Sequence, residues 1–259
     1  MRAARGHLIR ARQAATAISA GEHYQVAARW FHFATLGPNR DRALAAAEAD
    51  AAMGRALDMM EPRARRIEEP GFAGWLGGPV DAEATVVVVP GLDSSKEEFH
   101  DVINALLRRG LTVFAMDGPG QGVLAATTTV RADYHHVIGQ VIDALGTESV
   151  GLVGLSLGGY YVAESAARET RVAAAATVSG PFRLDWGGLP PPVREILIRR
   201  AAGPPGTTRA VPAHPSRRPP ARQRPPRLAG STRRLAYRST HLTRFIVKTA
   251  LITGGTSSR

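Results

Sequence analysis

VGLVGLSLGG, residues 150–159, is the stretch that decides the fold. Residues 150–153 form an apolar, partly β-branched run that predicts a buried strand, and residues 157–168 have the composition of a helix. Between them stands the pattern Gly-x-Ser-x-Gly, formed by Gly154, Ser156 and Gly158. Because the turn between such a strand and helix is too tight for side chains, the flanking glycines allow it, and the Ser156 hydroxyl is exposed at the carboxyl end of the strand. The pattern predicts a serine nucleophile.

A nucleophilic serine requires donors for the negative charge that develops on the attacked carbonyl oxygen. The helix expected to start at Leu157 directs backbone N–H groups and the positive end of its dipole toward Ser156. A second donor is expected in the loop at residues 90–95, after an earlier strand, and we predict an oxyanion hole formed by the N–H groups of Leu92 and Leu157. The alternative is a glycine turn in a nucleotide-binding sheet. The chain lacks G-x-G-x-x-G after its first strand and has no P-loop, which argues against that alternative.

Outward from this stretch, strands and helices alternate. Strands are predicted at 85–89, 112–116, 150–153 and 172–178, and helices at 96–109, 133–145 and 157–168. This order predicts a mostly parallel sheet with helices on both faces, the α/β class. Before it, residues 13–60 predict two helices separated by a turn at 36–39, and residues 67–78 predict edge strands. We therefore divide the chain into a helical segment (1–62), an α/β core (63–200) and a tail (201–259).

The tail differs in composition from the rest of the chain. The protein carries 33 Lys and Arg against 22 Asp and Glu, and residues 201–259 hold 12 of these cations, no acid and 8 of the 18 prolines. Unpaired like charges and frequent prolines predict a disordered tail, apart from a strand-like run at 245–255. The sheet is therefore expected to be incomplete at its C-terminal end. We interpret the abrupt change as a reading frame or gene end altered after about Arg200.

Other features of composition exclude several classes of protein. The absence of cysteine rules out disulfides, thiolate catalysis and cysteine-ligated metal sites. The first twenty residues lack the apolar core of a signal peptide, and no stretch approaches the roughly 20 apolar residues of a membrane span. These features predict a soluble, cytoplasmic protein with no membrane partner. No metal-ligand cluster or cofactor motif is found, so neither a metal nor a cofactor is expected, and the sequence makes no prediction about oligomeric state.

The strings VVVVPGLDSSKEEF, GLTVFAMDGPGQG, VGLVGLSLGGYY and VSGPF resemble the α/β-hydrolases, and within them the group of dihydroxypseudooxynicotine hydrolase and FrsA-like esterases. The paired helices that contain AARWFHFATL are similar to the helical segment of that group. The resemblance covers roughly residues 14–200. It implies a nucleophile at Ser156, an oxyanion hole at Leu92 and Leu157, and a cap built from the front helices and the residues after Pro181. It also implies hydrolysis of an ester, or of a C–C bond beside a ketone. Members commonly continue GPGQG with Glu, where this chain has Val123.

The partners of the nucleophile are not found at their expected places. In this fold an acid and then a histidine follow the serine, from loops after later strands. Asp185 lies just beyond the last predicted strand, and we take it as a substrate-binding candidate, with a solvated loop carboxylate as the alternative. Glu195 falls in a predicted cap helix, 192–200. His214 and His241 follow no recognisable strand, so no base is assigned.

Two functions from different classes remain open. The first is a serine hydrolase by ancestry, acting on a small molecule, whose catalysis is impaired because the acid and the histidine are missing. The second is a non-catalytic, hydrolase-like protein whose basic tail binds a polyanion. The tail has only Tyr237 and Phe245 as aromatic residues and no recognition module, so specific nucleic-acid binding is not expected.

Overall fold

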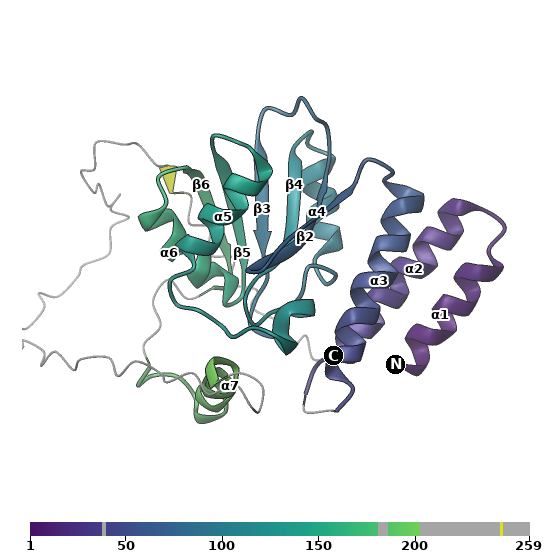
Figure 1. The fold of residues 1–259 in the computed structure, drawn as a ribbon, viewed down its shortest axis with the longest axis horizontal. Coiled ribbons are helices and arrows are strands. Elements are labelled where there is room, and N and C mark those ends of the chain that lie inside the picture. The colour runs from purple at the N-terminus through teal and green to yellow at the C-terminus, as the bar shows by residue number, and fades with distance from the viewer. Residues whose placement is uncertain (38–39, 181–185, 203–243, 246–259) are drawn as a thin grey trace, which may run out of the picture.

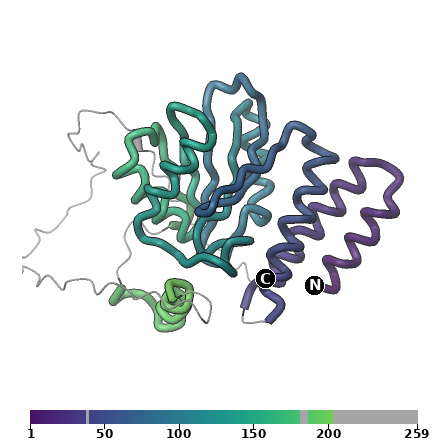
Figure 2. Tube along the Cα trace, in the orientation of Figure 1, coloured from purple at the N-terminus to yellow at the C-terminus, as the bar shows by residue number. Residues whose placement is uncertain are grey.

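The computed structural model describes residues 1–37, 40–180, 186–202 and 244–245. Three helices come first: α1 (Arg2–Gln13), α2 (Ala17–Phe33) and α3 (Arg42–Met60). They stand side by side next to the sheet, with α3 nearest to it and α1 farthest away (Figures 1 and 2). The two helices predicted over residues 13–60 are confirmed as α2 and α3. Helix α1 is additional and precedes the residues in which helices were predicted; its buried residues are Ala4 and Ala11.

The front helices pack through small side chains. Ala27 and Ala28 of α2 are fully buried, and Ala49 and Ala52 of α3 are nearly so. Side chains of this size let two helix backbones approach closely. Phe31 fills the remaining space and is 1% exposed. At the start of α2, the Thr16 hydroxyl accepts a hydrogen bond from Ser19 N–H at 3.1 Å and caps the helix.

The sheet contains β1 (Arg65–Glu69), β2 (Phe72–Gly77), β3 (Thr85–Val89), β4 (Thr112–Asp117), β5 (Val150–Leu155), β6 (Val172–Val178) and β7 (Arg244–Phe245). Their order is β1-β2-β4-β3-β5-β6-β7. β1 and β2 form an antiparallel hairpin that also pairs antiparallel with β4, whereas β4, β3, β5, β6 and β7 run parallel. The predicted mostly parallel sheet and its four predicted strands are confirmed.

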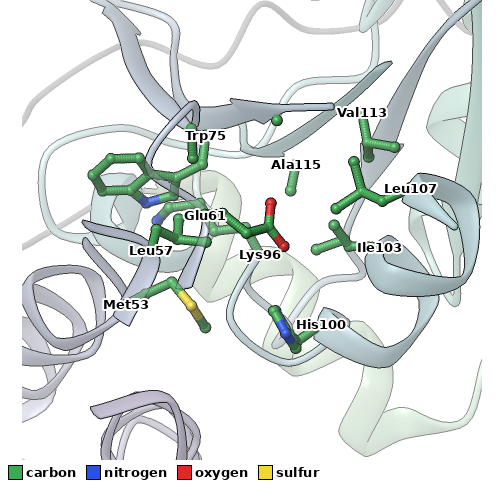
Figure 3. Close-up of a pocket in the computed structure, with 12 residues that line it drawn as sticks. Met53, Leu57, Glu61, Trp75, Lys96, His100, Ile103, Leu107, Val113 and Ala115 are labelled. Atoms are coloured by element: carbon green, nitrogen blue, oxygen red, sulfur yellow. The ribbon is translucent and has the colours of Figure 1, made fainter. Parts of the chain in front are cut away.

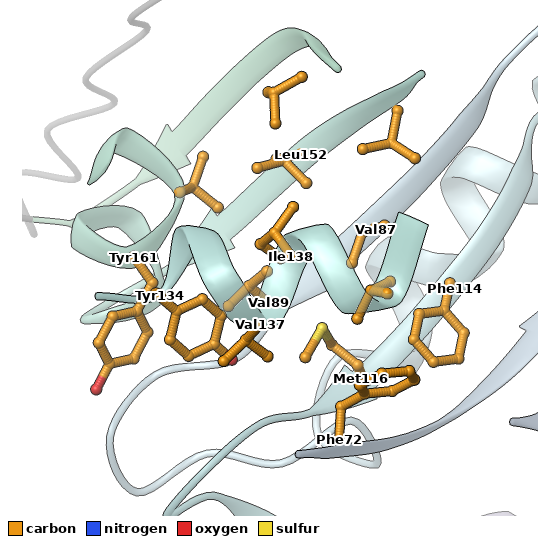
Figure 4. Close-up of a cluster of buried hydrophobic side chains, with 14 of the residues drawn as sticks. Phe72, Val87, Val89, Phe114, Met116, Tyr134, Val137, Ile138, Leu152 and Tyr161 are labelled. Atoms are coloured by element: carbon orange, nitrogen blue, oxygen red, sulfur yellow. The ribbon is translucent and has the colours of Figure 1, made fainter. Parts of the chain in front are cut away.

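Helices cover both faces of the sheet. α5 (His135–Leu145) and α6 (Gly158–Arg168) lie on one face, where Phe114 and Met116 of β4 join Ile138 and Tyr161 in the largest apolar core (Figure 4). On the other face α4 (His100–Leu107) packs against a smaller cluster that contains Val88, Val113 and Leu155. Neighbouring residues of one strand therefore serve opposite cores, which explains why the strands are apolar throughout.

Helix α4 starts later than predicted. A helix was expected over 96–109, but α4 begins at His100. The difference arises because the Lys96 N–H donates to Asp117 Oδ1 at 2.9 Å, and the Lys96 side chain is buried among carboxylates. Lys96 therefore contacts the end of β4, and the helix begins only after the residues that make this contact. A single turn of 3₁₀ helix, η1 (Gly122–Ala126), follows β4 on the side of α3.

The C-terminal part contributes α7 (Pro191–Ala202) and β7. The helix predicted over 192–200 is confirmed as α7, while its role as a cap stays a prediction. It lies below the body of the domain in Figure 1 and is joined to it by an Arg200–Asp93 ion pair of 2.6 Å. Apart from residues 201–202 and 244–245, the predicted disordered tail and its strand at 245–255 lie outside the described residues. Within the described part of the chain, no helix is long and apolar enough to cross a membrane.

Candidate active site

Ser156 occupies the turn between β5 and α6. Its φ is +55°, in the left-handed region that only glycine adopts easily, and its side chain is exposed. The strained turn is held by hydrogen bonds on both sides: Ser156 N–H donates to Val178 O at 2.9 Å, and Ser156 O accepts from Gly159 N–H at 2.9 Å. Strained residues that are held in this way gather at functional sites. The structure therefore presents the hydroxyl at the carboxyl end of the parallel strands, as the sequence predicts.

The glycines around Ser156 leave no room for side chains. A Cβ on Gly154 would lie 2.3 Å from Gly158 O, and a Cβ on Gly158 would lie 2.3 Å from Val89 O. Both clashes are with backbone, which cannot swing aside as a flexible side chain can. A third contact comes from Gly180 after β6, where a Cβ would lie 2.6 Å from Ser156 O. The turn is thus fixed by direct backbone packing against β3 and the end of β6.

The loop after β3 lies against Ser156. A Cβ on Gly91 would lie 2.9 Å from Ser156 Cβ and 3.2 Å from Ser156 Oγ, so this glycine permits the close approach. Leu92 follows it and packs its half-buried side chain against the main core. Within the described residues, neither the Leu92 N–H nor the Leu157 N–H makes a hydrogen bond. Two unused donors, one from each flanking segment, therefore stand beside the exposed hydroxyl, and they are the pair predicted as an oxyanion hole.

A buried ionic cluster anchors the same loop further along. Lys96 Nζ lies 2.7 Å from Asp117 Oδ2 and Glu97 Oε1 and 2.8 Å from Asp50 Oδ1. Asp50 also pairs with Arg66, so α3, β1, β4 and the loop meet in one network. Sequence reasoning missed this cluster, because its members are far apart in the chain. The only local signal is an Asp placed directly at the end of a strand, at Asp117.

Burial and the neighbouring charges together determine the direction of the pKa shifts in this cluster. Burial by itself disfavours the Lys96 cation, but the three carboxylates outweigh it and raise the pKa of Lys96 above its ordinary value. Burial likewise opposes the ionised form of Asp50, yet Lys96 and Arg66 hold the pKa of Asp50 below its ordinary value. The pKa of Glu97 is raised, chiefly by burial and further by Asp117 and Asp50, with only Lys96 opposing. The pKa of Glu97 thus shifts in the opposite direction to that of Asp50, since Glu97 has one cation beside it and Asp50 has two.

The front helices also reach the loop. His32 of α2 is 2% exposed, and its Nδ1 lies 2.9 Å from Ser95 Oγ while its Nε2 lies 3.3 Å from Glu98 Oε2. Although this is a serine–histidine–carboxylate arrangement, Ser95 is only 2% exposed, so a substrate cannot approach its hydroxyl. We interpret the trio as a structural connection between α2 and the loop. Its effect is to tie the helical segment to the residues beside Ser156.

No general base for Ser156 is found in the described part of the chain, where no side chain hydrogen-bonds to Ser156 Oγ. The acids that follow Ser156 have other partners: Glu164 pairs with His135 at 2.7 Å, Glu169 with Arg171 at 2.9 Å, and Glu195 with Arg199 at 3.2 Å. The predicted substrate-binding Asp185, together with His214 and His241, lies outside the described residues.

One pocket lies away from Ser156, between α3, α4, β2 and β4. Its walls are mainly apolar, including Met53, Leu57 and Trp75, and the Glu61 carboxyl group projects into it (Figure 3). Burial raises the pKa of Glu61. No residue of the turn at Ser156 lines this pocket, so it is separate from the candidate active site.

Comparisons with known proteins agree with this geometry. The family described as "Alpha/beta hydrolase family" matches residues 86–253. The 2,6-dihydropseudooxynicotine hydrolase of Paenarthrobacter nicotinovorans is 36% identical over 114 residues, which cover 42% of this chain and 31% of that protein. Hydrolase LUC6 of Fusarium sp is 32% identical over 172 residues, 57% of this chain and 41% of the relative. The chain thus spans less than half the length of these relatives.

Solved structures give the same result. The crystal structure of 2,6-dihydroxy-pseudo-oxynicotine hydrolase superimposes with a TM-score of 0.70 and 28% identity, covering 78% of this chain and 62% of that one. AbyA5 superimposes with a TM-score of 0.60 and 21% identity over 72% of this chain and 62% of its own, and this likeness shows the fold alone. Together with the family match, these superpositions bear out the resemblance predicted from the sequence.

Proposed function

Because the chain belongs to the alpha/beta hydrolase family, we propose that it is a serine hydrolase with Ser156 as its nucleophile, acting on a small molecule that contains an ester or a C–C bond beside a ketone. One observation carries this proposal: an exposed hydroxyl on a residue with φ of +55°, next to two backbone N–H groups that make no hydrogen bond within the described residues. The likeness to hydrolases of 36% and 32% identity supports the same reaction class.

The proposed chemistry follows from this arrangement. Ser156 Oγ attacks a carbonyl carbon and forms a new C–O bond, while the carbonyl π electrons move to the oxygen. The Leu92 and Leu157 N–H groups and the N-terminal end of α6 stabilise the resulting oxyanion, and removal of one such donor typically slows a reaction by about 10²–10³-fold. Collapse breaks the bond to the leaving group and expels an alkoxide from an ester, or an enolate from a ketone-activated C–C bond. The leaving group takes up the proton that Ser156 Oγ loses on attack, carried by water. Water then hydrolyses the acyl-serine, which releases the carboxylic acid and returns a proton to Ser156 Oγ.

We further propose that catalysis by this chain is impaired. A serine hydroxyl is a weak nucleophile until a base removes its proton. Within the described residues no imidazole or carboxylate contacts Ser156 Oγ, and the nearest candidate acids in sequence are paired with arginine or histidine. What remains is the oxyanion hole, which together with substrate binding supports a residual acceleration of roughly 10³–10⁴-fold over water in serine hydrolases whose triad is removed. Slow, Ser156-dependent turnover is therefore expected.

A fluorophosphonate probe tests the nucleophile directly. The wild-type chain, Ser156→Ala and Ser149→Ala are labelled in parallel and read by intact mass. Ser149 is the matched control, because it is exposed and lies at the opposite end of β5, where its side chain makes no hydrogen bond within the described residues. We expect one adduct on the wild type and on Ser149→Ala and none on Ser156→Ala. Labelling that does not depend on Ser156 refutes the proposal. Hydrolysis of p-nitrophenyl butyrate and of a 1,3-diketone then separates the two bond types.

The second candidate function rests on the charge of the tail, 12 cations without an acid over residues 201–259. In this alternative the chain is non-catalytic and binds a polyanion through released counterions, so affinity falls steeply with salt. Titration with duplex DNA at about 50 and 200 mM salt, repeated on a chain that ends at residue 202, tests it. Equal binding by both chains contradicts a role for the tail.

A further inference from the structure

Gln121 is a buried polar residue that contacts the loop beside Ser156. It follows β4, and its side chain is 0% exposed. Its Nε2 donates to Pro90 O at 2.6 Å and to Gly91 O at 3.0 Å, the two carbonyl groups that immediately precede Leu92. A buried side chain that uses both of its amide hydrogens on adjacent carbonyls fixes the direction of two successive peptide planes. Nothing in the proposed reaction so far uses this residue.

The orientation of the Gln121 amide is fixed by its other contacts. Its Oε1 accepts from Gly118 N–H at 2.9 Å and from Tyr134 OH at 3.0 Å. Because a backbone N–H can only donate, the amide oxygen must face Gly118, and the NH₂ group must face the loop. Tyr134 is itself completely buried and stacks on Tyr161 of α6, with ring centroids 4.3 Å apart. The amide is therefore held from the side of the helix that begins at the Ser156 turn.

These hydrogen bonds determine where the neighbouring N–H groups point. All described peptide bonds are trans, so each carbonyl lies opposite the N–H of the next residue. With the carbonyls of Pro90 and Gly91 directed at Gln121, the N–H groups of Gly91 and Leu92 must face the other way. Gly91 is the residue whose absent Cβ would lie 2.9 Å from Ser156 Cβ. The donors are thus presented on the side of the loop that is free of Gln121.

We propose that Gln121 is the positioning residue of the oxyanion hole: by binding the carbonyls of Pro90 and Gly91, it holds the Leu92 N–H in the direction required for the developing oxyanion. This inference rests on the proposed function of Ser156, which it deepens. Preorganised donors are effective because they need no rearrangement when charge develops. A loop that lost its two carbonyl bonds would have to undergo that rearrangement in each turnover.

Three variants separate this role from a merely structural one. Gln121→Met keeps the length of the side chain and removes both donors. Tyr134→Phe removes one bond to Gln121 Oε1 and leaves the two bonds to the loop, because Gly118 N–H still orients the amide. Gln140→Met makes the same exchange at an exposed position of α5. Each is compared with the wild-type chain by melting temperature, by the rate of fluorophosphonate labelling at Ser156, and by the NMR order parameters of the Gly91 and Leu92 amides.

We expect Gln121→Met to label about 10- to 100-fold more slowly. The order parameters of Gly91 and Leu92 should fall from about 0.85 to below about 0.6. Tyr134→Phe should melt at a lower temperature yet label within about twofold of the wild type, a split that a purely structural role does not produce. Gln140→Met should match the wild type in all three measurements. Unchanged order parameters in Gln121→Met, or equal slowing in Tyr134→Phe and Gln121→Met, overturn the inference.

Gln121→Glu keeps the inference testable if the methionine variant does not fold. The protonated carboxyl group of this variant can donate to one loop carbonyl, whereas its ionised form turns oxygen toward oxygen. Its labelling rate relative to the wild type should therefore rise as pH falls, and a ratio independent of pH contradicts the proposal. If the wild type itself shows no Ser156-dependent labelling, the proposed function fails, and the order parameters of Gly91 and Leu92 alone decide the role of Gln121.

Discussion

Removal of the Lys96 ammonium should destabilise the fold more than removal of any surface charge. In Lys96→Met, Asp117 and Glu97 lose the only cation that lies within salt-bridge distance of them in the described part of the chain, and both are almost fully buried, at 0% and 2% exposure. Asp50 keeps Arg66 as a partner. Breaking a buried ion pair by removing one partner costs about 3–5 kcal/mol. Because native domains are stable by only about 5–15 kcal/mol, the variant should lie close to the unfolding threshold.

Urea unfolding, followed by tryptophan fluorescence, measures this loss. With a slope of roughly 2–3 kcal/mol per molar urea, a loss of about 4 kcal/mol moves the midpoint by roughly 1.3–2 M. Arg131→Met provides the matched control, since Arg131 pairs with Asp133 at 2.7 Å with both side chains nearly half exposed. An exposed pair of this kind contributes about 0–1 kcal/mol.

The destabilisation should also depend on pH in a defined direction. The pKa of Glu97 is already raised by burial and by its neighbouring carboxylates, and Lys96 is the charge that opposes this rise. Without Lys96 the folded state binds the Glu97 proton more tightly than the unfolded state, whose glutamate pKa is about 4.3. Stability is then retained below that pH and lost as pH rises through the folded pKa. A loss under about 1 kcal/mol at pH 7, or one that does not grow between about pH 4.5 and 7, refutes this account of the cluster.

Three further outcomes are expected. Gly158→Ala should lower the free energy of unfolding by more than about 2 kcal/mol and abolish labelling at Ser156, because the added Cβ would lie 2.3 Å from Val89 O. The control, Gly6→Ala, adds a Cβ in a helix with nothing within 4 Å and should raise the free energy of unfolding by about 0.5–1 kcal/mol. Equal effects of the two substitutions would contradict the packing argument. Added imidazole should accelerate ester hydrolysis by the wild type but not by Ser156→Ala, since it supplies the missing base, and no acceleration would argue that the base is not what limits the chain. Burial lowers the pKa of His100, so the unfolded state binds the His100 proton more tightly, and the free energy of unfolding should fall as pH drops below about 6.5. His100→Gln should remove this pH dependence in unfolding titrations from about pH 7 to 5. If the free energy of unfolding of the variant changes with pH as in the wild type, another group causes the dependence.

The strands of the sheet were predictable because their signal is local. The run at 85–89 and the run at 172–178 have the bounds of β3 and β6, since β-branched and apolar residues end there at proline, glycine or polar residues. Helix α4 was predicted four residues too early. The residues from Lys96 onward have the composition of a helix, but the Lys96 N–H donates a hydrogen bond to Asp117 instead. Helix α1, whose buried residues are Ala4 and Ala11, precedes the residues in which helices were predicted.

The candidate site divides in the same way. The Gly154–Gly158 pattern predicted the turn at Ser156, and the order of the strands predicted that the loop after β3 would be its neighbour. The sequence did not indicate which groups hold that loop. Gln121 contacts Pro90 across 31 positions of the chain, and His32 contacts Ser95 across 63. The role predicted for Asp185 stays a prediction, because that residue lies outside the described part of the chain.

The sequence by itself determined the class of fold, the four central strands and the bend that exposes one hydroxyl, because each depends on side-chain period and on glycines within a few residues. Only the tertiary structure decided how the neighbouring donors are aimed. The hydrogen-bond partners of a buried amide or ammonium group depend on distances and directions that exist only after the helices and strands have packed. The partners of Lys96 and Gln121 therefore cannot be identified from the residues next to them in the sequence.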